Sequence, residues 1–208
     1  MTGVNRPTLL LTGFGPFPRV PDNPSIEVAL AAARRLAIEA PDLTVELLRL
    51  PTVWDLAPDM VAAAIDRLKP DALIHLGVAR RTRHLALETR ARNFASPITD
   101  ADDRLPRLAE LVPGGPPEID NTRAASALLR QLAAAGLKVA RAGRASSYVC
   151  NAVYYRSLWM MPAGAGPLPV MFMHLPADLR NISQRPTLAD AVTASVLIAR
   201  AMAATALR

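Results

Sequence analysis

The sequence predicts an α/β fold, a three-layer α/β/α domain spanning residues 1–208 in which a twisted, mostly parallel sheet lies between two layers of helices. Residues 8–77 alternate short apolar runs with helix-length segments, which is the pattern of parallel strands joined by right-handed crossovers. The run 71–77 is apolar almost throughout, as expected for a strand that is covered on both faces. The length of 208 residues suits one such domain better than two.

Apolar periodicity and turn residues set the elements in order along the chain. Asn23 and Pro24 supply an N-cap and a first helical residue, Lys69-Pro70 ends the second helix, and Gly136 closes the third as a C-cap. The residues that keep helical spacing along the first helix are Ile26, Leu30, Ala33 and Ala37. The predicted strands are 8–12, 44–50, 71–77, 85–93, 138–142 and 170–174, and the predicted helices are 24–40, 55–68, 122–135, one that begins near Cys150, and 187–206.

The segment 85–93 differs from the other strands because its residues alternate between apolar and polar. This pattern predicts a strand with one polar face that carries Glu88, Arg90 and Arg92, in an antiparallel excursion from the sheet. On such a face Glu88 is either a solvated carboxylate paired with an arginine or a catalytic group, and the first is the more common. The Pro-, Asp- and Gly-rich stretch 96–118 is a candidate lid or cleft wall.

The composition is that of a globular protein, with 51% hydrophobic, 20% charged and 4% aromatic residues. The net charge of +6 invites a nucleic-acid partner, but the basic residues are scattered and the one cluster, residues 80–84 with Arg90 and Arg92, has no interleaved aromatic rings. We therefore expect no nucleic-acid partner. With no export segment and no apolar run of roughly 18 residues, we also expect no membrane association and a cytoplasmic location.

The single cysteine, Cys150, lies where a small polar stretch gives way to an apolar, helix-length segment. In the first turn of a helix, unpaired backbone N–H groups and the helix dipole favour a thiolate. His174 follows at the end of an apolar strand, which is the arrangement that a cysteine nucleophile and its base require. The alternative is that Cys150 is a small buried hydrophobe. Of the other histidines, His75 lies within an apolar strand and is expected in the core, and His84 lies among arginines.

Phe14 and Phe17 lie in a Gly/Pro loop directly after the first strand, where the carboxyl ends of parallel strands place binding loops. The alternative is that both rings fold back onto the core. The loop has too few glycines for a phosphate cradle and no Lys-Ser/Thr after it. One cysteine and three scattered histidines give no metal-ligand spacing, and no Gly-x-Ser-x-Gly elbow of a serine hydrolase is present.

Four motifs in this order and at this spacing resemble those of the pyroglutamyl-peptidase I family, also called pyrrolidone-carboxylate peptidases. The interval from Glu88 to Cys150 is 62 residues and that from Cys150 to His174 is 24. The matches run from the first strand to the last helix, so the resemblance covers nearly the whole chain. The motifs are Leu11-Thr12-Gly13-Phe14-Gly15-Pro16-Phe17 with Asn23-Pro24-Ser25, the Glu88 segment ending in Ala91-Arg92-Asn93, Tyr148-Val149-Cys150-Asn151, and Phe172-Met173-His174-Leu175-Pro176.

The resemblance implies a cysteine peptidase that removes N-terminal pyroglutamyl (5-oxoproline) residues from peptides without a cofactor or metal. Cys150 would be the nucleophile, His174 its base and Glu88 the group that orients the imidazole, with an acyl-enzyme intermediate. A neutral lactam ring needs flat apolar walls and few polar contacts. The residues expected to bind it are Phe14, Phe17, Asn23 and Tyr148.

Two features of the sequence are compatible with more than one role or state. Asn23 is alternatively the helix cap that holds the loop in place. The sequence does not fix the oligomeric state, and a homo-oligomer, either a dimer or a tetramer, is compatible with it.

The chain also departs from the family pattern. Ala79-Arg80-Arg81-Thr82 replaces a Gly-Gly-Arg-Thr turn, with one extra residue after it, and residues 143–147 replace an Asn-Thr-Ala-Gly approach to the nucleophile. Residues 96–102 replace an Asp-Ala-Arg-Ile-Pro-Asp-Asn run, so the role of its arginine is either lost or taken by Arg90 or Arg92. These changes leave a catalytically impaired pseudo-enzyme or binding module of the same fold as the alternative.

Overall fold

The computed structural model describes residues 6–17, 20–142, 146–161, 169–181, 183 and 186–206. Within these ranges a six-stranded sheet has the strand order β2-β1-β3-β8-β4-β7, and a separate two-stranded sheet pairs β5 with β6. The strands of the larger sheet are β1 (Thr8–Phe14), β2 (Thr44–Leu50), β3 (Ala72–Val78), β4 (Leu85–Leu87), β7 (Val139–Arg141) and β8 (Val170–Leu175). The smaller sheet consists of β5 (Arg90–Arg92) and β6 (Glu118–Asp120).

The larger sheet is mixed but mostly parallel. β1 pairs in parallel with both β2 and β3, and β3 pairs in parallel with β8. β4 runs antiparallel to β8 and parallel to β7. The predicted α/β sheet is confirmed, and so is the antiparallel excursion that the alternating segment indicated.

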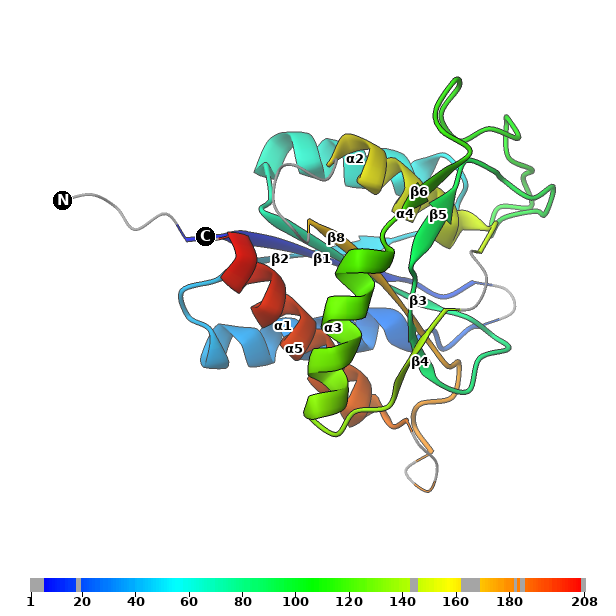
Figure 1. The fold of residues 1–208 in the computed structure, drawn as a ribbon. Coiled ribbons are helices and arrows are strands. Elements are labelled where there is room, and N and C mark those ends of the chain that lie inside the picture. The colour runs from blue at the N-terminus through cyan, green and yellow to red at the C-terminus, as the bar shows by residue number, and fades with distance from the viewer. Residues whose placement is uncertain are drawn as a thin grey trace.

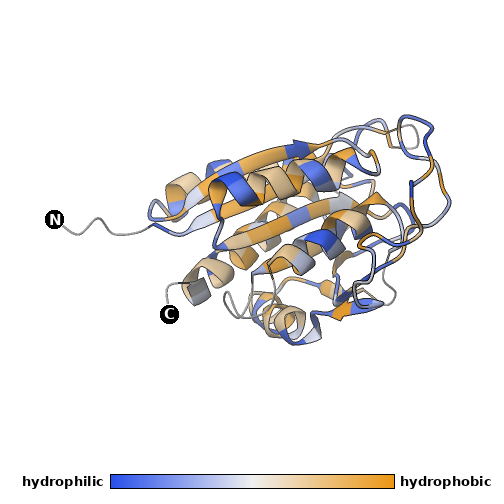
Figure 2. Ribbon diagram, turned by 90° about the horizontal axis from the view of Figure 1, so that it is seen from above, coloured by the Kyte–Doolittle hydropathy of each residue, from blue (hydrophilic) through white to orange (hydrophobic). Residues whose placement is uncertain are grey.

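Helices cover both faces of this sheet (Figure 1). Alternate residues of β1 point to opposite faces, so Leu9 and Leu11 join one hydrophobic cluster and Leu10 and Phe14 join another. Figure 2 shows the strands as mostly hydrophobic and the helices as two-faced. One layer consists of α1 (Pro24–Glu39), α3 (Thr122–Ala134) and α5 (Leu188–Ala206), and the other consists of α2 (Leu56–Leu68) and α4 (Val149–Met160).

The first helix begins as predicted but buries a different face. Asn23 caps α1, because its side chain accepts a hydrogen bond from the N–H of Ser25, and Pro24 is the first helical residue. Leu30, which was expected on the buried face, is 40% exposed. Because α1 is rich in alanine, apolar residues occur all round it, and the sequence pattern could not decide which stripe faces the sheet. The residues that it does bury are Pro24, Ser25, Val28, Ala29, Ala32 and Leu36.

The predicted strand 85–93 is two strands in two sheets, β4 and β5, separated by Glu88 and Thr89. Glu88 is therefore buried at 5% exposure, and the expectation that it lies on a polar face is wrong. The chain leaves one sheet for the other at this point, so the alternation of the sequence does not map onto a single surface. The other predicted elements have bounds within about two residues of those observed.

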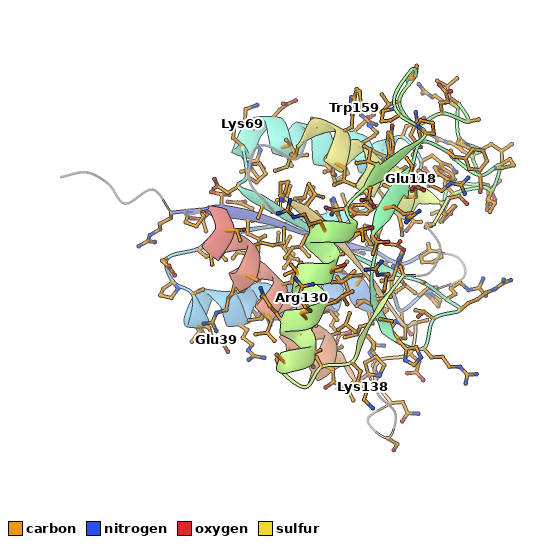
Figure 3. The ribbon with its side chains drawn as sticks, in the orientation of Figure 1. Glu39, Lys69, Glu118, Arg130, Lys138 and Trp159 are labelled. Carbon is orange, nitrogen blue, oxygen red and sulfur yellow. The ribbon has the colours of Figure 1, made fainter. Side chains whose placement is uncertain are left out.

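One helix is long and apolar enough to cross a membrane by length and composition. The window Leu188–Thr205 of α5 has a mean hydropathy of 1.4, which corrects the expectation that no segment reaches this length. In the structure α5 packs against α1 and α3, and Ala194, Ile198 and Met202 are buried. These contacts bury 44% of that window. The charged side chains labelled in Figure 3, such as Glu39, lie instead at the surface.

Candidate active site

Three neighbouring strands bring the predicted catalytic residues together. In the β3–β8 pair Gly77 lies opposite His174, and in the β4–β8 pair Ala86 lies opposite His174. Glu88 follows β4, and its backbone N–H donates to the carbonyl of Phe172. Side chains two residues apart on a strand share a face, so Glu88 and His174 lie diagonally on the same face of the sheet.

Glu88 and His174 form a short buried contact. Glu88 Oε1 lies 2.7 Å from His174 Nδ1, and each side chain is 7% exposed. Burial lowers the pKa of His174, but the hydrogen bonds and negative charges of Cys150 and Glu88 outweigh burial and raise this pKa to about 9. The second carboxylate oxygen, Glu88 Oε2, is buried and has no hydrogen-bond partner among the described residues. The pair therefore favours an imidazolium, and its ring orientation is fixed through Nδ1.

Cys150 lies beside this pair in the first turn of α4. Its side chain is partly exposed, it forms no disulfide, and it hydrogen-bonds to His174. The first N–H groups of a helix have no intrahelical acceptor. In α4 the earliest donors to a carbonyl at the start of the helix are Asn151 and Ala152, which both bond to Tyr148 O. The N–H groups of Val149 and Cys150 come before these donors in the chain, in the same first turn as the nucleophile candidate.

Asn151 ties this turn to the strand that follows Glu88. Its side-chain oxygen accepts from the N–H of Arg92, and its amide donates to the carbonyls of Arg92 and Phe94. The side chain is buried. The sequence placed Asn151 in the nucleophile motif without a role. The structure shows that it holds the Cys150 turn against β5 as a neighbouring strand would.

A cavity of about 490 Å³ opens onto Cys150 and His174. Its lining combines an apolar part with charged groups from two loops. The apolar and aromatic residues in the lining are Phe17, Val78, Ala79, Ile98 and Tyr148. The charged residues in the lining, apart from the predicted catalytic groups, are Arg80, Arg81, Asp100 and Asp103.

The predicted substrate-binding residues have different surroundings. Phe17 and Tyr148 line the cavity, and the Tyr148 hydroxyl donates to the carbonyl of Thr99. Phe14 is 1% exposed and packs in the core with α2 and α4, so the structure supports the alternative reading of this ring. Asn23 caps α1 and donates to the carbonyl of Gly15, which is its alternative role as the residue that holds the loop.

Asp100 was missed by the sequence analysis although it orders one wall of the cavity. Its carboxylate accepts from the backbone N–H groups of Trp54, Asp102 and Arg104, and the residue is buried. The Trp54 indole also donates to the carbonyl of Ile98. The predicted cleft wall 96–118 is thus a hydrogen-bonded loop. The sequence showed only that this stretch is irregular, and no motif distinguished Asp100 from the other aspartates in it.

No group of three or more His, Cys, Asp and Glu side chains that could hold a metal ion occurs in the described part of the chain. His75 is fully buried, as expected for a histidine within an apolar strand.

Comparisons with known proteins decide the family. The family model described as pyroglutamyl peptidase matches residues 7–206. Pyrrolidone-carboxylate peptidase 1 of Ralstonia nicotianae is 31% identical over 198 residues, which cover 93% of this chain and 91% of that protein. The pyrrolidone-carboxylate peptidase of Gloeobacter violaceus is 32% identical over 81% of this chain and 80% of its own length. The chain belongs to the pyroglutamyl peptidase family.

Solved structures agree with this assignment. The crystal structure of Bacillus amyloliquefaciens pyroglutamyl peptidase I superposes with a TM-score of 0.80 and 25% identity, covering 96% of this chain and 98% of the other. A mutant pyrrolidone carboxyl peptidase from Pyrococcus furiosus, at 24% identity and a TM-score of 0.79 over 93% and 96% of the two chains, has the same fold.

The sequence leaves the role of the missing family arginine either lost or taken by Arg90 or Arg92. Neither of them lines the cavity of about 490 Å³, but Arg90 lines a smaller pocket with Glu88, Cys150 and His174. Arg90 pairs with Glu118 at the surface, and the Arg92 guanidinium lies over the Phe94 ring, 5.6 Å from its centroid. Arg80 and Arg81 line the cavity instead. Of the changed approach to the nucleophile, residues 143–145 lie outside the described residues.

Proposed function

We propose that this chain removes N-terminal pyroglutamyl residues from peptides with Cys150, His174 and Glu88 as its catalytic triad. The observation that carries the proposal is the 2.7 Å contact between Glu88 Oε1 and His174 Nδ1 beside the only cysteine. This contact leaves the other ring nitrogen, Nε2, for the sulfur. Curated relatives named pyrrolidone-carboxylate peptidase support the same reaction.

In the proposed reaction His174 Nε2 already holds the proton of Cys150, as the raised pKa of His174 favours, and the thiolate sulfur attacks the carbonyl carbon of the pyroglutamyl residue. The tetrahedral intermediate collapses when the imidazolium gives its proton to the leaving amine, which departs and leaves a thioester. Water, deprotonated by His174, then attacks the thioester, which releases pyroglutamate and restores the Cys150 thiolate beside the His174 imidazolium. Glu88 stabilises the imidazolium in both halves of the reaction through Nδ1.

The negative oxygen of each tetrahedral intermediate needs donors that are already in place. The N–H groups of Val149 and Cys150, in the first turn of α4, supply them next to the sulfur. The lactam ring of the substrate is neutral, so its pocket needs apolar walls rather than a carboxylate. Phe17, Ile98 and Tyr148 supply such walls in the cavity that holds Cys150.

The experiment is turnover of a fluorogenic pyroglutamyl amide by the wild type, Cys150→Ala and Cys150→Ser. Both variants should fold and lose activity, because a serine hydroxyl stays protonated where a thiol ionises. Iodoacetamide should alkylate one thiol and inactivate the protein in proportion. Full activity in the alanine variant would overturn the nucleophile assignment, and a wild type without turnover would favour the impaired binding module. A free thiol nucleophile also suits a reducing compartment, so we place this activity in the cytoplasm.

A further inference from the structure

The turn after β3 carries two arginines into the active-site cavity. The N–H of Ala79 donates to the carbonyl of Leu175, and the N–H of Thr82 donates to the carbonyl of Ala79, closing a tight turn. Arg80 and Arg81 are the two central residues of this turn. Both line the cavity that contains Cys150, and Arg83, one residue beyond the turn, does not.

Neither guanidinium has an ion pair or side-chain hydrogen bond with the rest of the described chain. Both residues are exposed. Two positive charges that face a reaction cavity and have no partner among the described residues are available to a ligand. The turn is held by backbone hydrogen bonds, so it does not depend on arginine side chains at positions 80 and 81.

The negative groups that face the same cavity are mostly engaged elsewhere. Glu88 is bound to His174, and Asp100 accepts three backbone N–H groups of its own loop. Asp103 is the third carboxylate, and no side-chain partner is found for it among the described residues. The groups left for a ligand are therefore two guanidinium groups on the β3 turn and one carboxylate on the opposite loop.

The turn is close enough to Cys150 for its side chains to reach a substrate that is attacked there. A β-carbon at Gly77 would lie 3.1 Å from Cys150 Sγ, and Arg80 is three residues further along the chain, which spans at most about 10 Å. In a peptide, the carboxyl carbon of the residue after the scissile bond lies about 4 Å from the attacked carbon. An arginine side chain can cover the remaining distance.

We propose that Arg80 and Arg81 form a subsite for a carboxylate on the residue that follows pyroglutamate. This inference rests on the proposed function. The carboxylate has two sources: the free C-terminus of a pyroglutamyl dipeptide, or an acidic side chain in a longer peptide. The substrate class is thus pyroglutamyl peptides with a negative charge next to the cleaved bond, and Asp103 opposes this preference from the other wall.

The test compares matched substrates that differ by one charge. Pyroglutamyl-alanine is compared with its amide for the C-terminal source, and amidated pyroglutamyl-glutamate with amidated pyroglutamyl-glutamine for the side-chain source. Exposed ion pairs are weak, so Arg80→Gln with Arg81→Gln should lower the charged-to-neutral ratio of kcat/KM about three- to tenfold, mainly through KM. Added salt should reduce the wild-type ratio. Arg83→Gln, the matched control, should leave the ratio unchanged, and Asp103→Asn should raise it.

A ratio of one in the wild type, or equal losses on charged and neutral substrates in the double variant, would overturn the subsite. The source with the larger ratio is the one that the arginines recognise. Calorimetric binding of the same four peptides to the Cys150→Ala protein separates this inference from the proposed function. If no substrate is turned over but the charged peptides bind more tightly and lose that advantage in the double variant, the subsite stands and the chemistry fails.

Discussion

Gly77 and Cys150 are so close that a β-carbon on the glycine would lie 3.1 Å from the sulfur. The same β-carbon would lie 2.8 Å from Cζ of Phe172, which is too short for any real contact. The Phe172 ring in turn lies against His174, with ring centroids 4.7 Å apart. Because Gly77 has no side chain, the Cys150 sulfur and the Phe172 ring, which packs against His174, can occupy the space beside it.

Gly77→Ala should reduce activity much more than it reduces stability. The added methyl group must displace the sulfur or the Phe172 ring, and misplacement of a reacting group by about 1 Å can cost roughly a hundredfold in rate. The measurement is kcat/KM on a pyroglutamyl amide beside the unfolding free energy in urea.

The matched control is Gly136→Ala, at a positive φ of 78° with open space around it. It should cost about 1–2 kcal/mol of stability, because a side chain is strained in this conformation, and leave kcat/KM unchanged. Equal activity in wild type and Gly77→Ala would show that the sulfur has room to spare.

Glu88→Gln keeps the shape of the side chain and removes the charge that faces His174 Nδ1. We expect kcat to fall about ten- to a thousandfold, less than for loss of the nucleophile, because the imidazolium loses its stabilising partner. The carboxylate is one of the groups that raise the pKa of His174 to about 9, so the alkaline limb of the pH–rate profile should also move to lower pH.

The control for that variant is Glu118→Gln, which removes a carboxylate whose partner, Arg90, lies at the surface. Its rate and pH profile should match the wild type. A Glu88→Gln profile that falls in rate without moving in pH would assign Glu88 a structural role only.

The two phenylalanines of the first loop should separate stability from activity. Phe14→Ala removes a ring that is 1% exposed and should cost about 3–5 kcal/mol in unfolding free energy. Phe17→Ala removes a wall of the cavity and should raise KM for pyroglutamyl substrates with a small change in stability. Phe94→Ala, at 38% exposure and outside the cavity, is the control for loss of a surface ring. If Phe14→Ala instead raised KM with little loss of stability, while Phe17→Ala mainly lowered the unfolding free energy, Phe14 would be assigned to the substrate pocket.

Local signals in the sequence were enough for most of the elements, and for the positions of Cys150 at a helix start and His174 in the last strand, because an N-terminal helical turn and a strand end follow from neighbouring residues. They were not enough for β6 or for the division of residues 85–93 into two strands. The contact of Glu88 with His174 depends on the antiparallel register of β4 and β8, which no local pattern encodes. The burial of Glu88 was missed for the same reason. In the sequence, Arg80 and Arg81 belong to the one basic cluster of the chain and carry no signal of a site. Only the fold shows that their turn borders the cavity.

His75, in β3, forms a buried hydrogen-bond network, and its ring centroid lies 5.8 Å from that of Phe172, the ring that packs against His174. Its Nδ1 lies 2.8 Å from Thr12 Oγ1 and its Nε2 lies 3.0 Å from Ser157 Oγ. The Ser157 hydroxyl donates to the carbonyl of Val153, so it accepts from Nε2–H, and Nδ1 accepts from the Thr12 hydroxyl. Every polar group in this network is satisfied when the imidazole is neutral.

The stability of this protein should therefore fall as the pH drops below about 6.5. Burial lowers the pKa of His75 from 6.5 to about 3, so between these values the unfolded chain binds a proton that the folded chain does not. Each pH unit in that window costs about 1.4 kcal/mol, or about 2–3 kcal/mol between pH 6.5 and 4.5. His174 has the opposite sign, because its raised pKa adds stability as the pH falls from about 9 to 6.5, and that gain is complete before the window begins.

Urea unfolding of wild type and His75→Gln at several pH values between 7 and 4.5 measures the effect. The variant should be less stable at pH 7 because its hydrogen bonds are poorer. Its unfolding free energy should depend less steeply on pH, and the difference in slope should correspond to at most one proton taken up on unfolding. Parallel slopes for the two proteins would show that His75 takes up its proton in the folded state.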